Sequence, residues 1–237
     1  MNAPFRKPWT QTQFFAWDGH REGRYEFDGA QPVAMTGGTA NHSLITGNVN
    51  AVLRGRLRGS GCQPLGPDAG IATVGDAVRY PDALVTCSEF AGSALTIPGV
   101  VVVFEVLIPW LASRDPWYRV SFCAPPPANP ARIPNSGRTD RIVKVGEYAA
   151  VPSILRYVIL ESTSVGLTVF ERPNAGEPWR ACTLTGEDDI LRMPEIGIEV
   201  VARELYEGVA LNDTGEPPAA GETGEPPAGL LRTPPPR

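Results

Sequence analysis

The chain has no hydrophobic run long enough to cross a membrane. Its longest apolar stretch, Val100 to Leu107, falls far short of the roughly 20 residues that a membrane-spanning helix needs. The first residues, Met1 to Trp9, also lack the apolar core of a secretory signal. These absences exclude an integral membrane protein, and we expect a cytoplasmic protein that has no membrane partner.

Cysteine and histidine are both scarce. The four cysteines are widely separated and form no CxxC pair, and only His20 and His42 can serve as imidazole ligands. This spacing excludes a zinc ribbon and indicates no disulfide framework, so we predict reduced thiols. The cysteines are Cys62, Cys87, Cys123 and Cys182.

An excess of positive charge is missing as well. The formal net charge is −5, and residues 212–237 contribute −2 of it through four acidic residues and two arginines. A protein without a broad basic surface lacks the usual electrostatic footprint of a nucleic-acid-binding protein. Any contact with DNA is therefore expected to be local.

Proline and glycine are abundant, with 25 of each, and the end of the chain is rich in both. The sequence Thr-Gly-Glu-Pro-Pro-Ala occurs at Thr214 to Ala219 and again at Thr223 to Ala228. Such a composition buries too little apolar surface to offset the entropy of ordering, so we predict a disordered tail over 212–237. A proline-rich ligand for a partner is the alternative. The remaining residues, 1–211, have the length of one domain.

Helical and strand patterns alternate along the rest of the chain. From Asn41 to Leu57 the apolar residues keep helical spacing, with Thr39 or Asn41 as the N-cap. The run from Val100 to Leu107 is typical of a central strand that is buried on both faces. The alternation predicts an α/β fold in which helices flank a mixed β-sheet. The other predicted elements are helices at 10–17 and 139–150, a hairpin at 24–35 turning at 28–29, and strands at 69–74, 79–87, 157–161, 167–171 and 180–184.

Glu105 interrupts the apolar strand and calls for an explanation. An ionised carboxylate in such a strand is costly unless it is paired or bound to a metal. Asp82 precedes a neighbouring apolar segment, and Pro81 limits how that segment can begin. Two carboxylates from adjacent strands can hold one Mg²⁺, an ion that polarises a phosphoryl oxygen and lowers the pKa of an attacking water.

Several short motifs resemble the Uma-two family of restriction endonucleases, which belongs to the PD-(D/E)xK nuclease superfamily. The similarity spans roughly residues 10–206. In this family the lysine that normally follows the acid is replaced by valine or leucine, and the next helix supplies a lysine. Leu107 and Lys144 fit that displaced arrangement. The motifs are Arg24-Tyr-Glu-Phe-Asp28, Asn41-His-Ser43, Arg79-Tyr-Pro-Asp82, Phe104-Glu-Val-Leu107, Thr139-Asp-Arg-Ile-Val-Lys144 and Glu147-Tyr148.

The resemblance implies a restriction-endonuclease-like fold with an N-terminal helix and hairpin, and an endonuclease that hydrolyses DNA phosphodiester bonds. By the same resemblance Asp82 and Glu105 are ligands of Mg²⁺, which Mn²⁺ can replace. Lys144 is then the catalytic lysine, and Glu26 is a further acid that lines the site. The resemblance also implies a homodimer. Two additional neighbours of the site are Asp140 and His42.

The chain departs from the family pattern between Glu105 and Lys144, which lie 39 positions apart. About 25 residues are extra, either 108–132 or 110–134, and they show no helix or strand period. We expect an irregular loop near 108–135, whose closure entropy costs the fold only about 1.6 kcal/mol. The hypothesis is that this insertion modulates or abolishes cleavage; an insertion without any role is the alternative.

Each of the main site residues also has a purely structural explanation. Asp82 after a proline can cap a turn, and Glu105 can pair with an arginine. Lys144 can pair with Asp140 or Glu147 along one helix stripe. The remaining functional alternatives are a catalytically impaired nuclease-fold protein that binds DNA or a protein partner, and an interaction module.

Glu26 and His42 are open to structural explanations as well. Glu26 can face solvent on a hairpin, and His42 can lie at the surface or cap a helix. Three arginines near the end of the long helix can interact with its dipole rather than with phosphate. These arginines are Arg54, Arg56 and Arg58.

Overall fold

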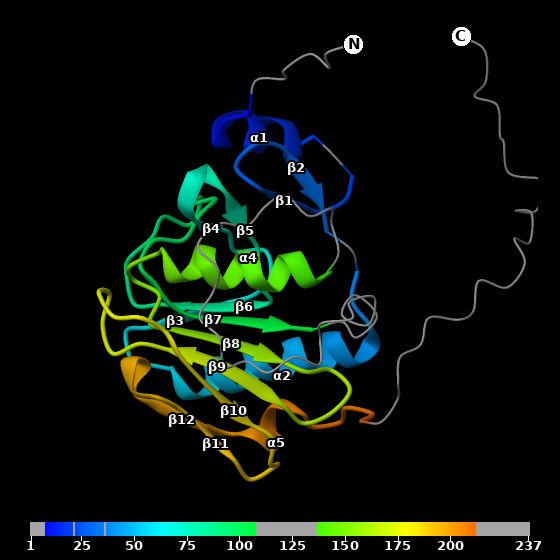
Figure 1. Ribbon diagram of the computed structural model, residues 1–237, viewed down its shortest axis with the longest axis vertical. Helices are drawn as coiled ribbons and strands as arrows, with labels where there is room; N and C mark the ends of the chain where they lie inside the picture. The colour runs from blue at the N-terminus through cyan, green and yellow to red at the C-terminus, as the bar shows by residue number, and fades with distance from the viewer. Residues whose placement is uncertain (1–7, 21, 36, 108–136, 212–237) are drawn as a thin grey trace, which may run out of the picture.

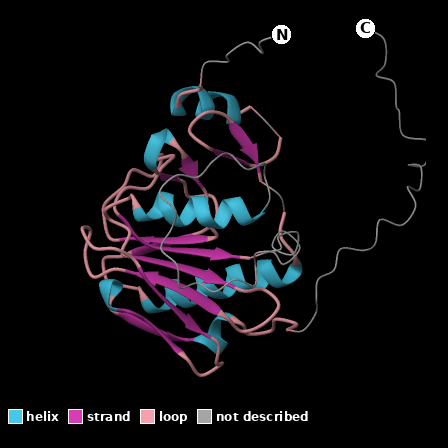
Figure 2. Cartoon of the chain, viewed as in Figure 1, coloured by secondary structure: helices cyan, strands magenta, loops and turns pink. Residues whose placement is uncertain are grey.

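The computed structural model describes residues 8–20, 22–35, 37–107 and 137–211, and of residues 137–142 it describes the backbone only. The predicted insertion near 108–135 and the predicted tail at 212–237 lie outside the described residues. Figures 1 and 2 show a central sheet with helices on both sides and a smaller N-terminal part above it.

The central sheet has six strands in the order β10-β9-β8-β7-β6-β3. Its neighbours pair antiparallel, except that β7 and β8 are parallel. The predicted mixed sheet flanked by helices is therefore confirmed. The strands are β3 (Gln63–Leu65), β6 (Ala83–Thr86), β7 (Val100–Val106), β8 (Arg156–Leu160), β9 (Leu167–Glu171) and β10 (Arg180–Leu184).

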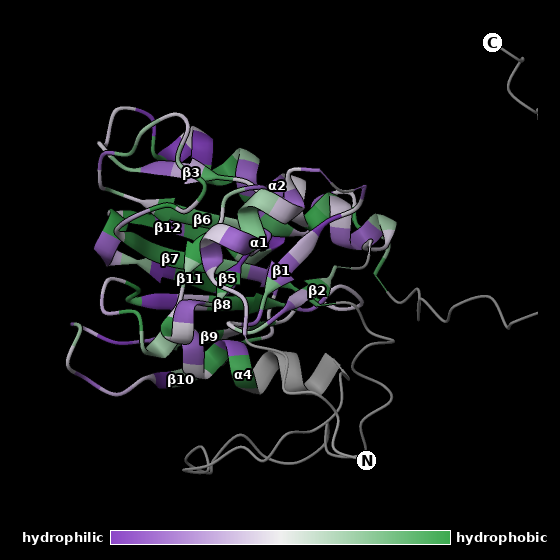
Figure 3. Ribbon diagram, turned by 90° about the horizontal axis from the view of Figure 1, so that it is seen from above, coloured by the Kyte–Doolittle hydropathy of each residue, from purple (hydrophilic) through white to green (hydrophobic). Residues whose placement is uncertain are grey.

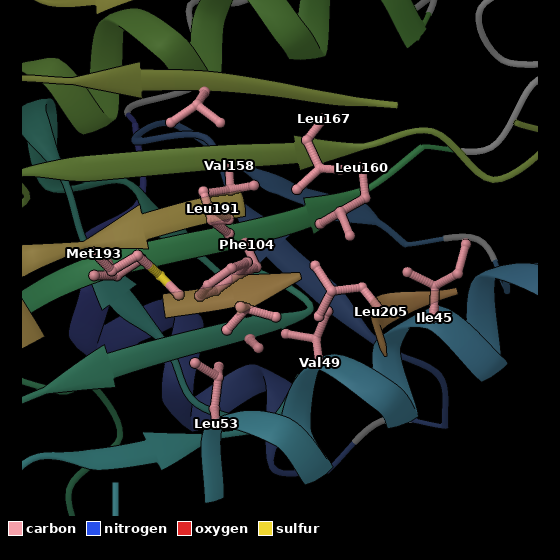
Figure 4. Close-up of a cluster of buried hydrophobic side chains, with 14 of the residues drawn as sticks. Ile45, Val49, Leu53, Phe104, Val158, Leu160, Leu167, Leu191, Met193 and Leu205 are labelled. Atoms are coloured by element: carbon pink, nitrogen blue, oxygen red, sulfur yellow. The ribbon is translucent and has the colours of Figure 1, made fainter. Parts of the chain in front are cut away.

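Helix α2 (Ala40–Arg56) covers one face of this sheet. The Thr39 side chain caps it by accepting the backbone N–H of His42 at 3.1 Å, which selects one of the two predicted caps. Its buried residues recur every fourth position, so that one helical stripe packs on the strands. Figure 4 shows these side chains, Ile45, Val49 and Leu53, pointing toward Phe104 and its neighbours in the sheet.

Helix α4 (Gly137–Ala149) covers the opposite face (Figure 1). Successive residues of β7 alternate between the two faces. Phe104 packs in the cluster with α2, whereas Val103 packs in a second cluster with Tyr148 of α4. Burial on both faces explains why this strand is apolar along its length, and Figure 3 shows hydrophobic residues along the strands and hydrophilic residues in many loops.

The N-terminal part is a helix on a small second sheet. Helix α1 (Gln11–Asp18) is capped by Thr10, whose side chain accepts the N–H of Gln13. The sheet has the order β2-β1-β5-β4, and Phe14 stacks on Phe27 with ring centroids 5.2 Å apart. The predicted helix and hairpin are confirmed. The strands are β1 (Tyr25–Phe27), β2 (Pro32–Ala34), β4 (Ile71–Ala72) and β5 (Val78–Arg79).

The predicted strand at 79–87 is wrong in one respect, because it is two strands in two different sheets. Strand β5 ends at Arg79 in the small sheet, and β6 begins at Ala83 in the large one. Between them lies Pro81, which has no N–H to donate to a ladder and therefore interrupts the pairing. The two sheets consequently meet beside Asp82.

The last described segment holds elements that the sequence patterns did not predict. A hairpin of β11 (Ile190–Met193) and β12 (Ile198–Val201) packs through Leu191, Met193 and Val200 on the side of α2.

Strand β3 was also not predicted. Of the strand predicted at 69–74, only Ile71–Ala72 form a strand, which is β4. The short helices are η1 (Val74–Asp76), η2 (Pro194–Ile196) and α5 (Ala202–Leu205).

The prediction of reduced thiols is wrong for one pair, because Cys62 and Cys87 form a disulfide. The antiparallel pairing of β3 with β6 sets Gln63 opposite Thr86, so the residues just beyond this pair face each other. Because the two cysteines are 25 positions apart in the sequence, their spacing did not indicate this pairing. Cys182 is free and exposed, and Cys123 lies outside the described residues.

No helix among the described residues is both long and apolar enough to span a membrane.

Candidate active site

Glu105 lies near the end of β7 and faces α4. Its Oε1 accepts a hydrogen bond from the Tyr148 hydroxyl and is paired with Lys144 Nζ, each at 3.2 Å. Lys144 is only 8% exposed. Because the two sequence positions are 39 apart, packing of α4 on the sheet brings them together.

Glu26 on β1 joins the same cluster from the small sheet. Its side chain is buried, which contradicts the alternative that it faces solvent. Oε1 accepts Lys144 Nζ at 3.0 Å and the backbone N–H of Tyr80 at 3.2 Å, while Oε2 accepts Arg79 Nη1 at 3.2 Å. Lys144 therefore lies between two carboxylates, those of Glu26 and Glu105.

Arg79 and Glu147 are members of this cluster that were not predicted as site residues. Arg79 Nε and Nη2 donate to the two oxygens of Glu147 at 2.6 and 2.7 Å. Glu147 thus pairs with an arginine of β5 rather than with Lys144 on its own helix. Both residues occur in the motifs that carry the family resemblance, which was the available signal, but their pairing joins positions 68 apart.

Asp82 lies at the start of β6, where the register Ala83↔Phe104 brings it next to Glu105 on the neighbouring strand. Its Oδ2 accepts the backbone N–H of Val106 at 2.7 Å, and its Oδ1 lies 3.2 Å from His42 Nε2. The two residues therefore lie on neighbouring strands, but their carboxylates have different partners, His42 of α2 for Asp82 and residues of α4 for Glu105. His42 thus lies beside Asp82, and its side chain is 18% exposed.

Other charged residues have different surroundings. Arg56 binds both oxygens of Glu204 at 2.8 and 2.6 Å and the carbonyl of Glu199, so its contacts are structural. Asp68 is paired with Arg24 at 3.4 Å. The side chain of Asp140 lies outside the described residues.

The electrostatics of the cluster keep Tyr148 protonated. Burial raises the pKa of the Tyr148 hydroxyl well above its usual range, and the nearby charge of Glu105 raises it further. A neutral phenol donates a hydrogen bond to a carboxylate, whereas a phenolate would repel it. The pKa of Tyr80 is also raised, to about 12. Burial is the largest cause, and the negative charge of Asp18 is the next.

The donor set can be tested for a metal. Among the described residues no group of three or more histidine, cysteine or acidic side chains converges on one point. Mg²⁺ commonly takes only one or two protein carboxylates and completes its shell with water and substrate phosphate. The hard oxygen donors of Asp82 and Glu105, on neighbouring strands, fit that requirement.

Comparisons with known proteins agree with this fold. Residues 11–117 match the model of the Uma2 family, described as "Putative restriction endonuclease"; the match includes Glu26, Asp82 and Glu105 and ends before Lys144. An uncharacterized protein of Synechocystis, slr1290, is 26% identical over 214 residues, which cover 88% of this chain and 96% of that protein.

A solved structure shares the fold. The crystal structure of a putative nuclease of the DUF820 group from Anabaena variabilis has a TM-score of 0.57 and 12% sequence identity, and the likeness covers 84% of this chain and 98% of that one. At this identity the likeness concerns the fold. Residues 11–117 are therefore similar to the Uma2 family, and the whole fold is similar to that of the putative nuclease.

Proposed function

We propose that this protein is a metal-dependent endonuclease that hydrolyses phosphodiester bonds in DNA. The observation that carries the proposal is the position of Lys144, which reaches from α4 to within 3.2 Å of Glu105 and 3.0 Å of Glu26. A lysine is rarely buried unless it is paired. Its convergence with the acids of two sheets supports a catalytic lysine displaced onto a helix, as the family resemblance implies.

Asp82 and Glu105 would hold Mg²⁺ or Mn²⁺. When bound, the ion would polarise a phosphoryl oxygen and lower the pKa of a water. The Val106 N–H and His42 orient the Asp82 carboxylate, and Tyr148 orients that of Glu105. These contacts hold the two acids in defined positions before substrate arrives.

The ammonium of Lys144 would act on the reacting phosphate. Its Nζ lies 3.0 Å from Glu26 Oε1 and 3.2 Å from Glu105 Oε1. In a buried setting a fixed positive charge stabilises developing negative charge more strongly than it would in water. Lys144 therefore supplies electrostatic stabilisation at the phosphate or orients the attacking water.

The proposal is tested by incubating the purified protein with supercoiled plasmid and Mg²⁺ or Mn²⁺. We expect metal-dependent nicking that a chelator stops and that Asp82→Ala abolishes. Asp68→Ala is the matched control, because Asp68 also follows a proline but its side chain is 93% exposed. It should nick the plasmid like the unchanged protein.

A different outcome supports the alternative function. A folded protein that retains DNA on a gel without cutting it under any metal condition is a catalytically impaired nuclease-fold protein. In that case the segment at 108–135, which separates the two halves of the site in sequence, becomes the first region to delete.

A further inference from the structure

We propose that Arg79 is a positioning residue of the site, which sets α4 against the sheet through Glu147 and holds Lys144 beside Glu105 through Glu26. This inference rests on the proposed function, because it assigns a role within the same site.

The position of Lys144 has to be determined by contacts of α4 in space. Lys144 and Glu105 are 39 positions apart, and a long connection restricts the register of a helix only weakly. At the far end of the helix, Arg172 donates to the carbonyls of Ala149 and Val151. These bonds fix the C-terminal end of α4. They do not contact the turn that carries Lys144, which other contacts must position.

Arg79 provides those contacts with all three nitrogens of its guanidinium. Nε and Nη2 grip the two oxygens of Glu147 at 2.6 and 2.7 Å, and Nη1 reaches Glu26 at 3.2 Å. A two-pronged arginine pair defines direction as well as distance, because the fork and the carboxylate must be coplanar. The Arg79 side chain is 6% exposed, so its role is exerted within the protein.

The geometry links this pair directly to Lys144. Glu147 and Lys144 are three residues apart on one side of α4. Glu26 shares its two oxygens between Arg79 on one side and Lys144 on the other. A shift of Arg79 would therefore displace Lys144 by two routes: through Glu147 on the same helix, and through the shared carboxylate of Glu26.

Lys144 can be followed chemically with unusual selectivity. The chain has 21 basic residues, but only Lys7 and Lys144 are lysines. The rate at which an amine-acylating reagent labels Lys144, measured by mass spectrometry against Lys7 in the same molecule, reports how well the site protects this ammonium. This measurement requires no DNA and no cleavage.

The decisive variant is Arg79→Lys, which keeps the charge but lacks the fork. We expect labelling of Lys144 to become about tenfold faster relative to Lys7, through easier local opening of the cluster. In the cleavage assay we expect kcat to fall by about a hundredfold, as for a misplaced catalytic group, with little change in KM. Glu147→Gln should shift both quantities in the same direction.

The matched control is Arg156→Lys. Arg156 is equally buried and also grips two glutamates, so the substitution tests a general loss of buried pairing. It should leave the relative labelling of Lys144 and the cleavage rate unchanged. If Arg79→Lys does not fold, Glu147→Gln carries the test alone.

The outcomes separate this inference from the proposed function. Unchanged labelling of Lys144 in folded Arg79→Lys and Glu147→Gln proteins overturns the positioning role, whatever the nuclease assay shows. Faster labelling in a protein that never cleaves DNA supports the positioning role while the proposed function fails. Equal effects of Arg156→Lys would also overturn it.

Discussion

Arg79 and Arg156 make the same arrangement of ion pairs in two regions of this protein. Each guanidinium side chain is 6% exposed, grips one glutamate with Nε and Nη2, and sends Nη1 to a second glutamate. The partners are Glu147 and Glu26 for Arg79, and Glu195 and Glu171 for Arg156.

The difference lies in what each second glutamate contacts. Glu26 is buried and forms an ion pair with Lys144, whose Nζ is also paired with Glu105. Glu171, by contrast, has a side chain that is 42% exposed. The two networks also lie on opposite sides of the central sheet. Arg79 of the small sheet pairs with Glu147 of α4, whereas Arg156 is on the α2 side, since Val158, two residues further along β8, packs with α2.

The comparison indicates that a buried arginine with two acids is in itself only a connection between elements. At Arg156 it joins β8, β9 and η2. At Arg79 the second glutamate, Glu26, also pairs with Lys144, and Lys144 pairs with Glu105. Such a concentration of titratable groups is typical of functional sites. A functional role is therefore expected at one arginine and a structural role at the other.

The largest expected contrast is between Glu105→Gln and Glu195→Gln. Loss of the Glu105 charge should reduce cleavage about a thousandfold, because metal-assisted charge stabilisation contributes several kcal/mol and each 1.36 kcal/mol is about a factor of ten. Glu195→Gln breaks a buried pair and should lower the free energy of unfolding by about 3 kcal/mol while the folded protein keeps its cleavage rate. Plasmid nicking and urea unfolding measure the two effects. A comparable loss of cleavage in Glu195→Gln would remove the distinction between the regions.

A smaller effect, on stability, is expected for Lys144→Met. Glu26 and Glu105 then lose the ammonium that they share, and the free energy of unfolding should fall by about 3 kcal/mol, as for other broken buried pairs. Adding Glu26→Gln to this variant should recover part of the stability and none of the activity. Urea titrations of the single and double variants provide the measurement. Undiminished stability of Lys144→Met would mean that the cluster does not depend on its lysine.

The smallest expected effect concerns Tyr148, which belongs only to the Arg79 region. Its pKa is raised by burial, so the folded protein keeps a proton that the unfolded chain releases above about pH 10. The unfolded state then binds fewer protons, and stability falls as pH rises beyond that value. Tyr148→Phe should cost about 1 kcal/mol at neutral pH through the lost hydrogen bond and should make the alkaline decline shallower. Urea unfolding between about pH 9 and 11 checks this; parallel curves for both proteins would contradict it.

Elements with a strong local pattern could be predicted from the sequence. Helix α2 and strand β7 were predicted because their apolar residues repeat with the period of a helix or form an unbroken run. The hairpin of β11 and β12 was not predicted. The strand expected at 79–87 extended through Pro81, where the chain passes from one sheet into the other.

The candidate site was predictable only in part. Glu105 drew attention because an acid in an apolar strand needs compensation, and Asp82 because it precedes the neighbouring strand. Arg79 and Glu147 carried no such signal, since an arginine and a glutamate that lie 68 positions apart are ordinary polar residues in a sequence. The Cys62–Cys87 bond was missed for the same reason, because strand pairing brings the two thiols together.

The sequence by itself determined the α/β class, the main helices and strands, and the presence of an acid that a buried strand cannot leave uncompensated. These properties depend on periodicity and composition, which act over a few residues. Only the tertiary structure decided that Glu26, Arg79 and Glu147 surround Lys144, and that Asp82 meets His42. Ion pairs depend on distance in space and on burial, and both are set by how two sheets and a helix pack together.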